Sequence, residues 1–229
     1  HAGRCIPIFQ EHHSEVAGPV CEAECRKINE AFFRWITAKK PFVLLKLAET
    51  LDGRIATENG SSQWITGEAA RKHVQKLRRW ADAVMAGAET YRKDVPRFTV
   101  RGRDGKVLKI PRRIIVTHTP EKFLPYPDGW EFVSLDTREK WEAFLEKLGA
   151  ENITSLLIEG GGELAASALR AGIVDKAEFH IAPKILGGRG SRPSVGGENP
   201  ASVSESLELE WVSSRRLGDD FIISGYLKK

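Results

Sequence analysis

Short apolar runs alternate with helical patterns along most of this 229-residue chain. The apolar run at 41–48 is followed by a helical pattern at 67–80, and the run at 153–158 by another at 162–171. Such alternation predicts a parallel sheet with helices packed on its faces. The last two apolar runs flank a turn that contains Gly218, which predicts a hairpin. We therefore expect an α/β fold with a mostly parallel central sheet, flanking helices and a C-terminal antiparallel hairpin.

The same patterns give the expected bounds of each element. The predicted strands are 41–48, 83–86, 113–117, 131–134, 153–158, 176–182, 207–215 and 221–227. The predicted helices are 22–37, 67–80, 137–148 and 162–171, with Gly149 expected to close the third. Loops at 102–111 and 187–202 are rich in Gly, Pro, Ser and charge, so we expect both to be mobile, and the second to cover a site or form a subunit contact.

Glu159 ends the strand at 153–158, and three glycines, Gly160 to Gly162, separate it from the next helix. Glycines let the backbone turn sharply and approach a ligand closely. The start of the following helix offers free N–H groups and a partial positive charge, which suit a phosphate. A glycine run alone is equally compatible with a turn that binds nothing. The carboxylate directly before the glycines favours a site.

A similar layout occurs earlier in the chain. Gly87 follows a strand, and Thr90 and Asp94 are four residues apart, so one helical turn places them on the same face. Pro96 then forces the chain out of the helix, and Arg101 lies just beyond it. The alternative is a short capped helix whose charges are merely solvated.

The sequence around three further residues makes them candidates for a binding or catalytic role. Lys46 stands in the apolar run FVLLKLA, where burial would lower the pKa of its amine. The alternative is a position at the sheet edge, where the stem covers apolar surface and the ammonium reaches water. Trp64, in the turn SSQWIT, is as compatible with packing as with a cofactor contact. Thr66 is suited to cap the helix at 67–80.

Taken together, these segments resemble the reductase domain of the bacterial riboflavin-biosynthesis deaminase/reductase. The matching words are KLAETLDGRIAT, SQWIT, VQKLR, GAETYRKDVPRFTVR, IEGGGELAASAL and IAPKILGG, which span about residues 41–227. CRKINEAFFRWI, at 25–36, resembles the linker between the two domains of that family. The resemblance implies a dihydrofolate-reductase-like fold, a homodimer, and the NADPH-dependent reduction of 5-amino-6-(5-phosphoribosylamino)uracil to the phosphoribitylamino product.

The resemblance also implies roles for individual residues. The substrate would contact Ser62, Thr66, Arg78, Phe98, Arg101 and Glu159. The cofactor would contact Ala48, Trp64, Thr90, Asp94, His118, Gly161, Gly162, Glu163, Leu164, Ala165, Ala166 and Ser167. The catalytic candidates are Lys46, Asp94 and Glu159, with the proton donor open between Lys46 and Asp94. Arginine suits phosphate because its guanidinium binds through two parallel hydrogen bonds, so Arg78 and Arg101 are the phosphate candidates.

Composition narrows the remaining possibilities. The net charge of +4 is modest and the basic clusters are dispersed without interleaved aromatics, so we expect no nucleic-acid partner. No apolar run approaches the ~18 residues of a membrane helix. Three cysteines are too few for a disulfide framework and match no standard zinc spacing, so we expect a cytoplasmic protein that holds no metal.

The first forty residues contain neither of the two motifs that zinc deaminases require. We therefore divide the chain into an N-terminal segment with a linker helix (1–40), a remnant next to a deaminase domain, and a reductase domain (41–229). Two other functions compete with the reductase of the riboflavin pathway. One is a reductase of the same fold that acts on another small molecule such as a pterin, and the other is a non-catalytic remnant of a fused enzyme.

Overall fold

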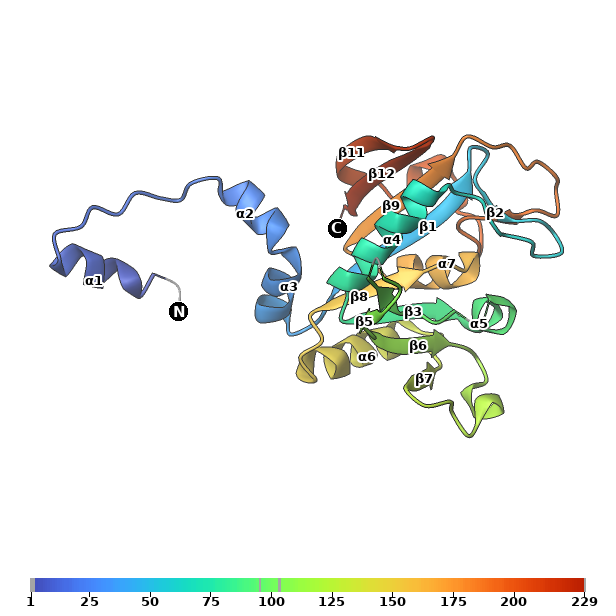
Figure 1. Ribbon diagram of the computed structural model, residues 1–229, viewed down its shortest axis with the longest axis horizontal. Helices are drawn as coiled ribbons and strands as arrows, with labels where there is room; N and C mark the ends of the chain where they lie inside the picture. Colours follow the sequence, from blue (N-terminus) through green and yellow to red (C-terminus); the bar gives the residue numbers. More distant parts are fainter. Residues whose placement is uncertain (1–2, 95, 103, 229) are drawn as a thin grey trace.

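The structure, a computed structural model, describes residues 3–94, 96–102 and 104–228, and centres on one eight-stranded sheet (Figure 1). The strands lie in the order β11–β12–β9–β1–β8–β3–β6–β7. Their bounds are β1 (Phe42–Thr50), β3 (Ala83–Gly87), β6 (Arg112–Val116), β7 (Trp130–Val133), β8 (Ser155–Glu159), β9 (Lys176–Ala182), β11 (Leu209–Leu217) and β12 (Asp220–Leu227). All neighbours from β9 to β7 pair in parallel, whereas β12 pairs antiparallel with both β9 and β11. The predicted mostly parallel sheet with a C-terminal hairpin is confirmed.

Helices cover both faces of the sheet. They are α4 (Glu68–Trp80), α5 (Ala88–Asp94), α6 (Arg138–Ala150) and α7 (Gly162–Arg170). Alternate residues of each strand serve the two faces. Leu45 of β1 packs with Leu145 of α6 and Leu164 of α7 in one buried cluster. Leu44, its neighbour, belongs to a second cluster against which Leu77 of α4 packs. Residues of β1 with even numbers therefore face α4, and this is the face that carries Lys46.

Each of the two segments that we predicted to be loops contributes one strand to a small two-stranded sheet. β10 (Arg192–Pro193) pairs with β2 (Arg54–Ala56), and β5 (Val107–Lys109) pairs with β4 (Val100–Arg101). The β10–β2 pairing joins residues far apart in sequence, and the β5–β4 pairing spans a short turn. Local composition does not reveal either pairing. Two 3-10 helices complete the connections, η1 (Pro120–Phe123) and η2 (Val203–Glu205).

The end of α6 differs from the prediction. The helix does not close at Gly149 but continues to Ala150, and Asn152 takes the left-handed conformation with φ of 61°. Gly149 is required for another reason. A Cβ at this position would lie 1.9 Å from the carbonyl oxygen of Lys39, so the glycine lets the chain before β1 pass directly over the helix.

The N-terminal segment forms three short helices, α1 (Cys5–Glu11), α2 (Glu22–Ile28) and α3 (Glu30–Ala38). Figure 1 shows α1 standing apart from the sheet and α3 lying beside it. The prediction of one helix over 22–37 is wrong because the chain breaks at Asn29, whose φ of −107° and ψ of 22° are not helical. α3 is anchored by Trp35, whose indole Nε1 donates to the Gly149 carbonyl at 2.9 Å.

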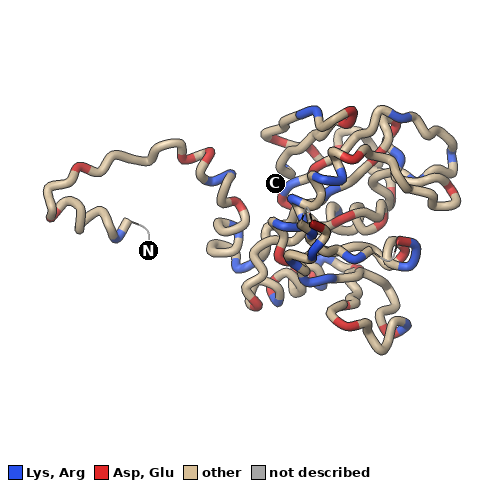
Figure 2. The backbone as a smooth tube through the Cα atoms, viewed as in Figure 1, with Lys and Arg blue, Asp and Glu red and all other residues tan. Residues whose placement is uncertain are grey.

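Charged residues of both signs are interspersed over the sheet domain, as Figure 2 shows. No described helix is both long enough and apolar enough to cross a membrane.

Candidate functional site

A cavity of about 1320 Å³ opens at the carboxyl ends of β1, β3, β6 and β8. This is where open α/β sheets bind their ligands. Sixteen of the nineteen candidate site residues line it. They are Lys46, Ala48, Ser62, Trp64, Thr66, Arg78, Thr90, Asp94, Phe98, His118, Glu159, Gly161, Gly162, Glu163, Leu164 and Ser167. With three exceptions, the predicted substrate and cofactor residues thus line the same cavity.

Arg78 and Glu159 form a two-pronged ion pair in the wall of the cavity. Arg78 Nε donates to Glu159 Oε1 at 2.6 Å and Nη2 donates to Oε2 at 2.8 Å. The guanidinium carbon also lies 5.3 Å from the centre of the Phe98 ring. The pair forms because α4 crosses the face of the sheet to which Glu159, the last residue of β8, points.

Lys46 lies next to Glu159, since the two residues are opposite each other in the parallel pair β1–β8. On its other side Lys46 is opposite Glu178 of β9. Burial lowers the pKa of Lys46; Glu159 opposes this, Arg78 adds to it, and Glu178 opposes it. The expectation of a lowered lysine pKa is confirmed, because Lys46 sits in the middle of the sheet rather than at its edge.

The glycine turn after β8 adopts conformations that favour glycine. The φ angles of Gly160 and Gly161 are 74° and 90°, and α7 starts at Gly162 without a side-chain cap. The N–H groups of its first turn therefore remain available to a ligand. The loop after β9 packs on this turn, where Gly196 N donates to the Gly162 carbonyl at 3.0 Å. The prediction that this loop covers a site agrees with its contribution of Arg192, Pro193 and Gly196 to the cavity wall.

Helix α5 supplies another part of the cavity wall, beside the glycine turn. Thr90 and Asp94 both line it, and Asp94 Oδ1 accepts a hydrogen bond from Gln63 Nε2 at 3.1 Å. Trp64 is largely exposed and lies under the guanidinium of Arg71, 4.8 Å from its carbon. This arrangement leaves one face of the indole for a ligand.

Thr66 does not cap α4, contrary to the expectation. The N-cap of α4 is Gly67, whose N–H donates to Asp220 Oδ2 at 2.7 Å. The carbonyl of Thr66 instead accepts from Arg71 Nη1 at 2.7 Å. The capping carboxylate comes from β12, 153 residues further along the chain.

Three candidate residues lie outside the cavity. Arg101 is exposed in β4, and its Nη1 donates to the Gly105 carbonyl at 2.9 Å. Ala165 is buried in the core beneath α7, and Ala166 is buried under the loop at Gly197. The structure therefore does not bring Arg78 and Arg101 together as a pair of phosphate ligands, because one is bound to Glu159 and the other points into its own turn.

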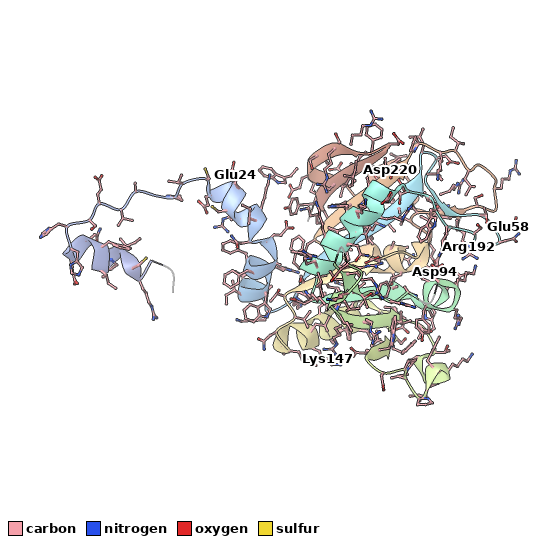
Figure 3. All side chains as sticks on the ribbon, in the orientation of Figure 1. Glu24, Glu58, Asp94, Lys147, Arg192 and Asp220 are labelled. Atoms are coloured by element: carbon pink, nitrogen blue, oxygen red, sulfur yellow. The ribbon has the colours of Figure 1, made fainter. Side chains whose placement is uncertain are left out.

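Several residues at the cavity escaped the sequence reading. Gln63 lies within the segment SQWIT, which resembles the family, so its neighbours could have identified it as a site residue. Arg71 and Arg97 also line the cavity, but nothing in the sequence separates them from other surface arginines. Arg192 comes from a distant loop and forms an ion pair with Glu89 at 2.6 Å. Figure 3 shows Asp94 and Arg192 at the same end of the molecule.

A cluster beside Lys46 joins His73 of α4 to Glu178 and His180 of β9. Its ligand-type atoms are within 4.8 Å of one another, a composition known from metal sites. Glu178 Oε1 is 2.8 Å from His73 Nε2 and 2.6 Å from His180 Nε2, which are hydrogen-bond distances. Two cations, Arg215 and Lys46, face the cluster. We therefore describe it as a hydrogen-bonded network.

The fold and the cavity together define a dihydrofolate-reductase-like α/β domain with a ligand site at its strand ends. The chain belongs to the RibD C-terminal domain family, whose sequence pattern matches residues 41–223.

Three relatives illustrate this membership. A riboflavin biosynthesis protein RibD from Actinobacillus pleuropneumoniae is 34% identical over 97% of this chain and 66% of its own length. A 2,5-diamino-6-ribosylamino-4(3H)-pyrimidinone 5′-phosphate reductase from Methanothermobacter thermautotrophicus is 34% identical over 82% of this chain and 99% of its own length. The crystal structure of a deaminase/5-amino-6-(5-phosphoribosylamino)uracil reductase from Thermotoga maritima superposes with a TM-score of 0.81 at 29% identity, over 99% of this chain and 68% of that one. The chain thus spans about two thirds of the RibD relatives that it matches.

Proposed function

We propose that this chain is an NADPH-dependent reductase of riboflavin biosynthesis that converts 5-amino-6-(5-phosphoribosylamino)uracil to 5-amino-6-(5-phosphoribitylamino)uracil. The observation that carries the proposal is the meeting of Lys46, Glu159 and the glycine turn at one cavity. Acid–base groups and a phosphate-type helix start then face the same space. The names of the relatives from Methanothermobacter and Thermotoga support the same reaction class.

The cavity fits a dinucleotide together with a second ligand. Small-molecule pockets usually measure roughly 300–1,000 Å³, and this one measures about 1320 Å³. The uncapped start of α7 would hold a phosphate through Gly161 and Gly162, and Trp64 and Thr90 would flank the remainder of the cofactor. When bound, the nicotinamide supplies the hydride.

The reaction adds a hydride to C1′ of the sugar and a proton to the ring oxygen that leaves C1′, while the nicotinamide is oxidised. Lys46 Nζ would supply that proton, because the residue lines the cavity beside Glu159 and desolvation lowers the pKa of its ammonium. Asp94 is the second candidate donor, and its Oδ1 accepts a hydrogen bond from Gln63. Glu159 and Arg78 would orient the substrate, and Arg101 would bind its phosphate once its side chain leaves Gly105.

One assay tests the proposal. Purified protein is mixed with NADPH and the phosphoribosylaminopyrimidine, and absorbance at the nicotinamide band is followed. We expect turnover that depends on both components and stops when the 5′-phosphate is removed. Turnover of a pterin but not of this substrate would indicate the related reductase function, and no turnover of either would indicate a non-catalytic remnant.

Three further assignments belong to the proposal. We assign residues 1–40 as a segment that adjoins a deaminase domain, in line with the separate position of α1 in Figure 1. We place the enzyme in the cytoplasm, which suits the free state of Cys5, Cys21 and Cys25. We also assign a homodimer, since β11 is the outer strand of the sheet and carries exposed Trp211 and Val212. Light scattering of the purified protein measures this last point.

A further inference from the structure

A row of three charged residues crosses the middle of the sheet. Glu159 of β8, Lys46 of β1 and Glu178 of β9 occupy matching positions on neighbouring parallel strands. Residues in register on adjacent strands point to the same face. All three therefore lie beneath α4, with the lysine between the two carboxylates. Lys46 and Glu159 line the cavity, whereas Glu178 does not, so Glu178 faces Lys46 from behind.

Glu178 is fixed by contacts that leave its charge intact. Its Oε1 accepts from His180 Nε2 at 2.6 Å, and His180 is fully buried with its Nδ1 unpartnered among the described residues. A carboxylate can only accept, and Nδ1 has no acceptor to which it could donate. The proton of this ring is therefore on Nε2, which donates it to Glu178. Burial lowers the pKa of His180, which keeps the ring neutral. Burial raises the pKa of Glu178, but hydrogen bonds from His180 and His73 outweigh it and leave the pKa well below its usual range.

The outer side of Glu178 is closed by His73 and Arg215. His73 Nε2 lies 2.8 Å from Glu178 Oε1 and also 2.8 Å from Arg215 Nη2. One ring nitrogen cannot donate to the carboxylate and accept from the guanidinium at once, so these two contacts compete. Arg215 Nη2 itself is 4.0 Å from Glu178 Oε2 and its side chain is 54% exposed. Water screens such an exposed cation.

The two carboxylates next to Lys46 therefore differ. Glu159 shares its charge with Arg78 through two hydrogen bonds and is expected to meet the substrate. Glu178 is held by the imidazoles of His73 and His180 and by a partly solvated arginine, away from the cavity. Its charge lies in register with Lys46 and raises the pKa of that lysine, and it lies outside the cavity that a ligand would fill.

We propose that Glu178, held in place by His73 and His180, is a positioning residue that keeps the Lys46 ammonium charged and directed into the cavity. The inference rests on the proposed function only in that Lys46 acts on the substrate. The charged and titratable groups that face Lys46 are Glu159 from β8, Arg78 from α4, and Glu178 and His180 from β9. His73 and Arg215 act one contact further out, through Glu178.

The test measures the titration of Lys46 directly. Protein labelled with ¹³C at the lysine Cε is titrated by NMR, and the Lys46 signal is assigned as the one missing from Lys46→Met. Glu178→Gln keeps the shape but removes the charge, so the ammonium is less stabilised and loses its proton at lower pH. We expect the titration to move to lower pH, by less than removal of the Glu159 charge would move it, because Glu178 raises the pKa of Lys46 less than Glu159 does. Glu178→Asp keeps the charge and is expected to restore most of the shift.

Kinetics give a second readout. In Glu178→Gln the basic limb of the kcat/KM profile should move to lower pH, while kcat on the plateau changes little. The exposed Glu208→Gln, which only breaks a surface pair with Lys228, is the matched control and should change neither. If the wild-type protein has no reductase activity, the proposed function is wrong. The NMR titration does not depend on activity, so it would still test this inference.

A second variant, expected to shift the Lys46 titration in the opposite direction, controls for folding defects. Arg215→Gln removes the cation next to Glu178, so the Lys46 titration should move to higher pH by a smaller amount. General destabilisation cannot move the two variants in opposite directions. If Glu178→Gln folds and Lys46 titrates as in the wild type, the inference is wrong. If Glu178→Gln does not fold, the absence of an upward shift in Arg215→Gln overturns it.

Discussion

Arg78 and Glu159 bind each other through two parallel hydrogen bonds at the wall of the cavity, although both are expected to contact the substrate. Their side chains are 19% and 10% exposed. The pair satisfies two charges that would otherwise be desolvated without a partner. A ligand that binds both residues must therefore replace, or fit around, contacts that already exist.

Glu159→Gln tests the value of this pair. The change leaves the Arg78 guanidinium without a counter-ion in a mostly buried place, which should lower the free energy of unfolding by about 1–3 kcal/mol. Urea denaturation measures the loss. Glu142→Gln is the control, because Glu142 pairs with Lys40 at a more exposed position and should cost less than about 1 kcal/mol. Equal losses in the two variants would contradict this prediction.

Arg101→Ala tests the phosphate contact. If the side chain leaves Gly105 to bind the phosphate, its loss should raise KM for the substrate about tenfold or more, the worth of a charge-assisted hydrogen bond. NADPH affinity, measured by fluorescence titration, should stay the same. Arg97→Ala is the informative comparison, because Arg97 already lines the cavity. A large KM effect in Arg97→Ala alone would transfer the phosphate contact to Arg97.

Asp94→Asn tests the second proton donor. We expect kcat to fall by about 10²-fold or more if Asp94 transfers a proton. The amide still fits beside Gln63, so KM for both ligands should change little. Steady-state kinetics with Glu121→Gln, an exposed residue outside the cavity, provide the baseline. A near-normal kcat would leave Lys46 as the donor.

Asp220→Ala tests the long-range cap of α4. The buried carboxylate accepts from Gly67 N at 2.7 Å, so its loss should cost about 0.5–2 kcal/mol of stability, the usual worth of an N-cap. Thermal and urea denaturation measure the change. Asp220→Asn keeps an acceptor and should lose less, whereas a Thr66→Ala variant should leave the cap unaffected.

His180 makes stability depend on pH. Its pKa lies below the ordinary 6.5 in the folded protein because of burial, so only the unfolded chain gains this proton just below pH 6.5. The stability that it contributes is complete above pH 6.5 and declines as pH falls through the lower folded-state pKa. Urea denaturation between pH 7.5 and 5 should show a shallower decline in His180→Asn. The exposed His12→Gln should follow the wild type, and parallel curves for all three would refute the prediction.

Much of the fold follows from local patterns in the sequence. β9 begins and ends where the apolar alternation predicts, and α4 starts within one residue of its expected position. The glycine turn was identifiable because only glycine readily adopts the φ angles of Gly160 and Gly161. The direction of the Lys46 pKa shift followed from the apolar residues that precede and follow it in the strand.

The remainder depends on contacts between distant segments. Asp220 binds the N-cap residue of a helix 153 residues earlier, and Arg192 reaches the cavity from a loop without regular pattern. The network of His73, Glu178 and His180 joins a helix to a strand about one hundred residues away. Such contacts are set by the packing of complete elements, so periodicity and local composition do not reveal them.

The contact of Trp35 with Gly149 has a practical consequence for shortened forms of the protein. A version starting at residue 41 would match the family boundary but would remove the indole, so the Gly149 carbonyl would keep only the Asn152 N–H as a donor. A version starting at Glu30 would keep α3 and its hydrogen bond from Trp35 to the end of α6. Laboratories that trim this protein for crystallisation should therefore cut between α2 and α3.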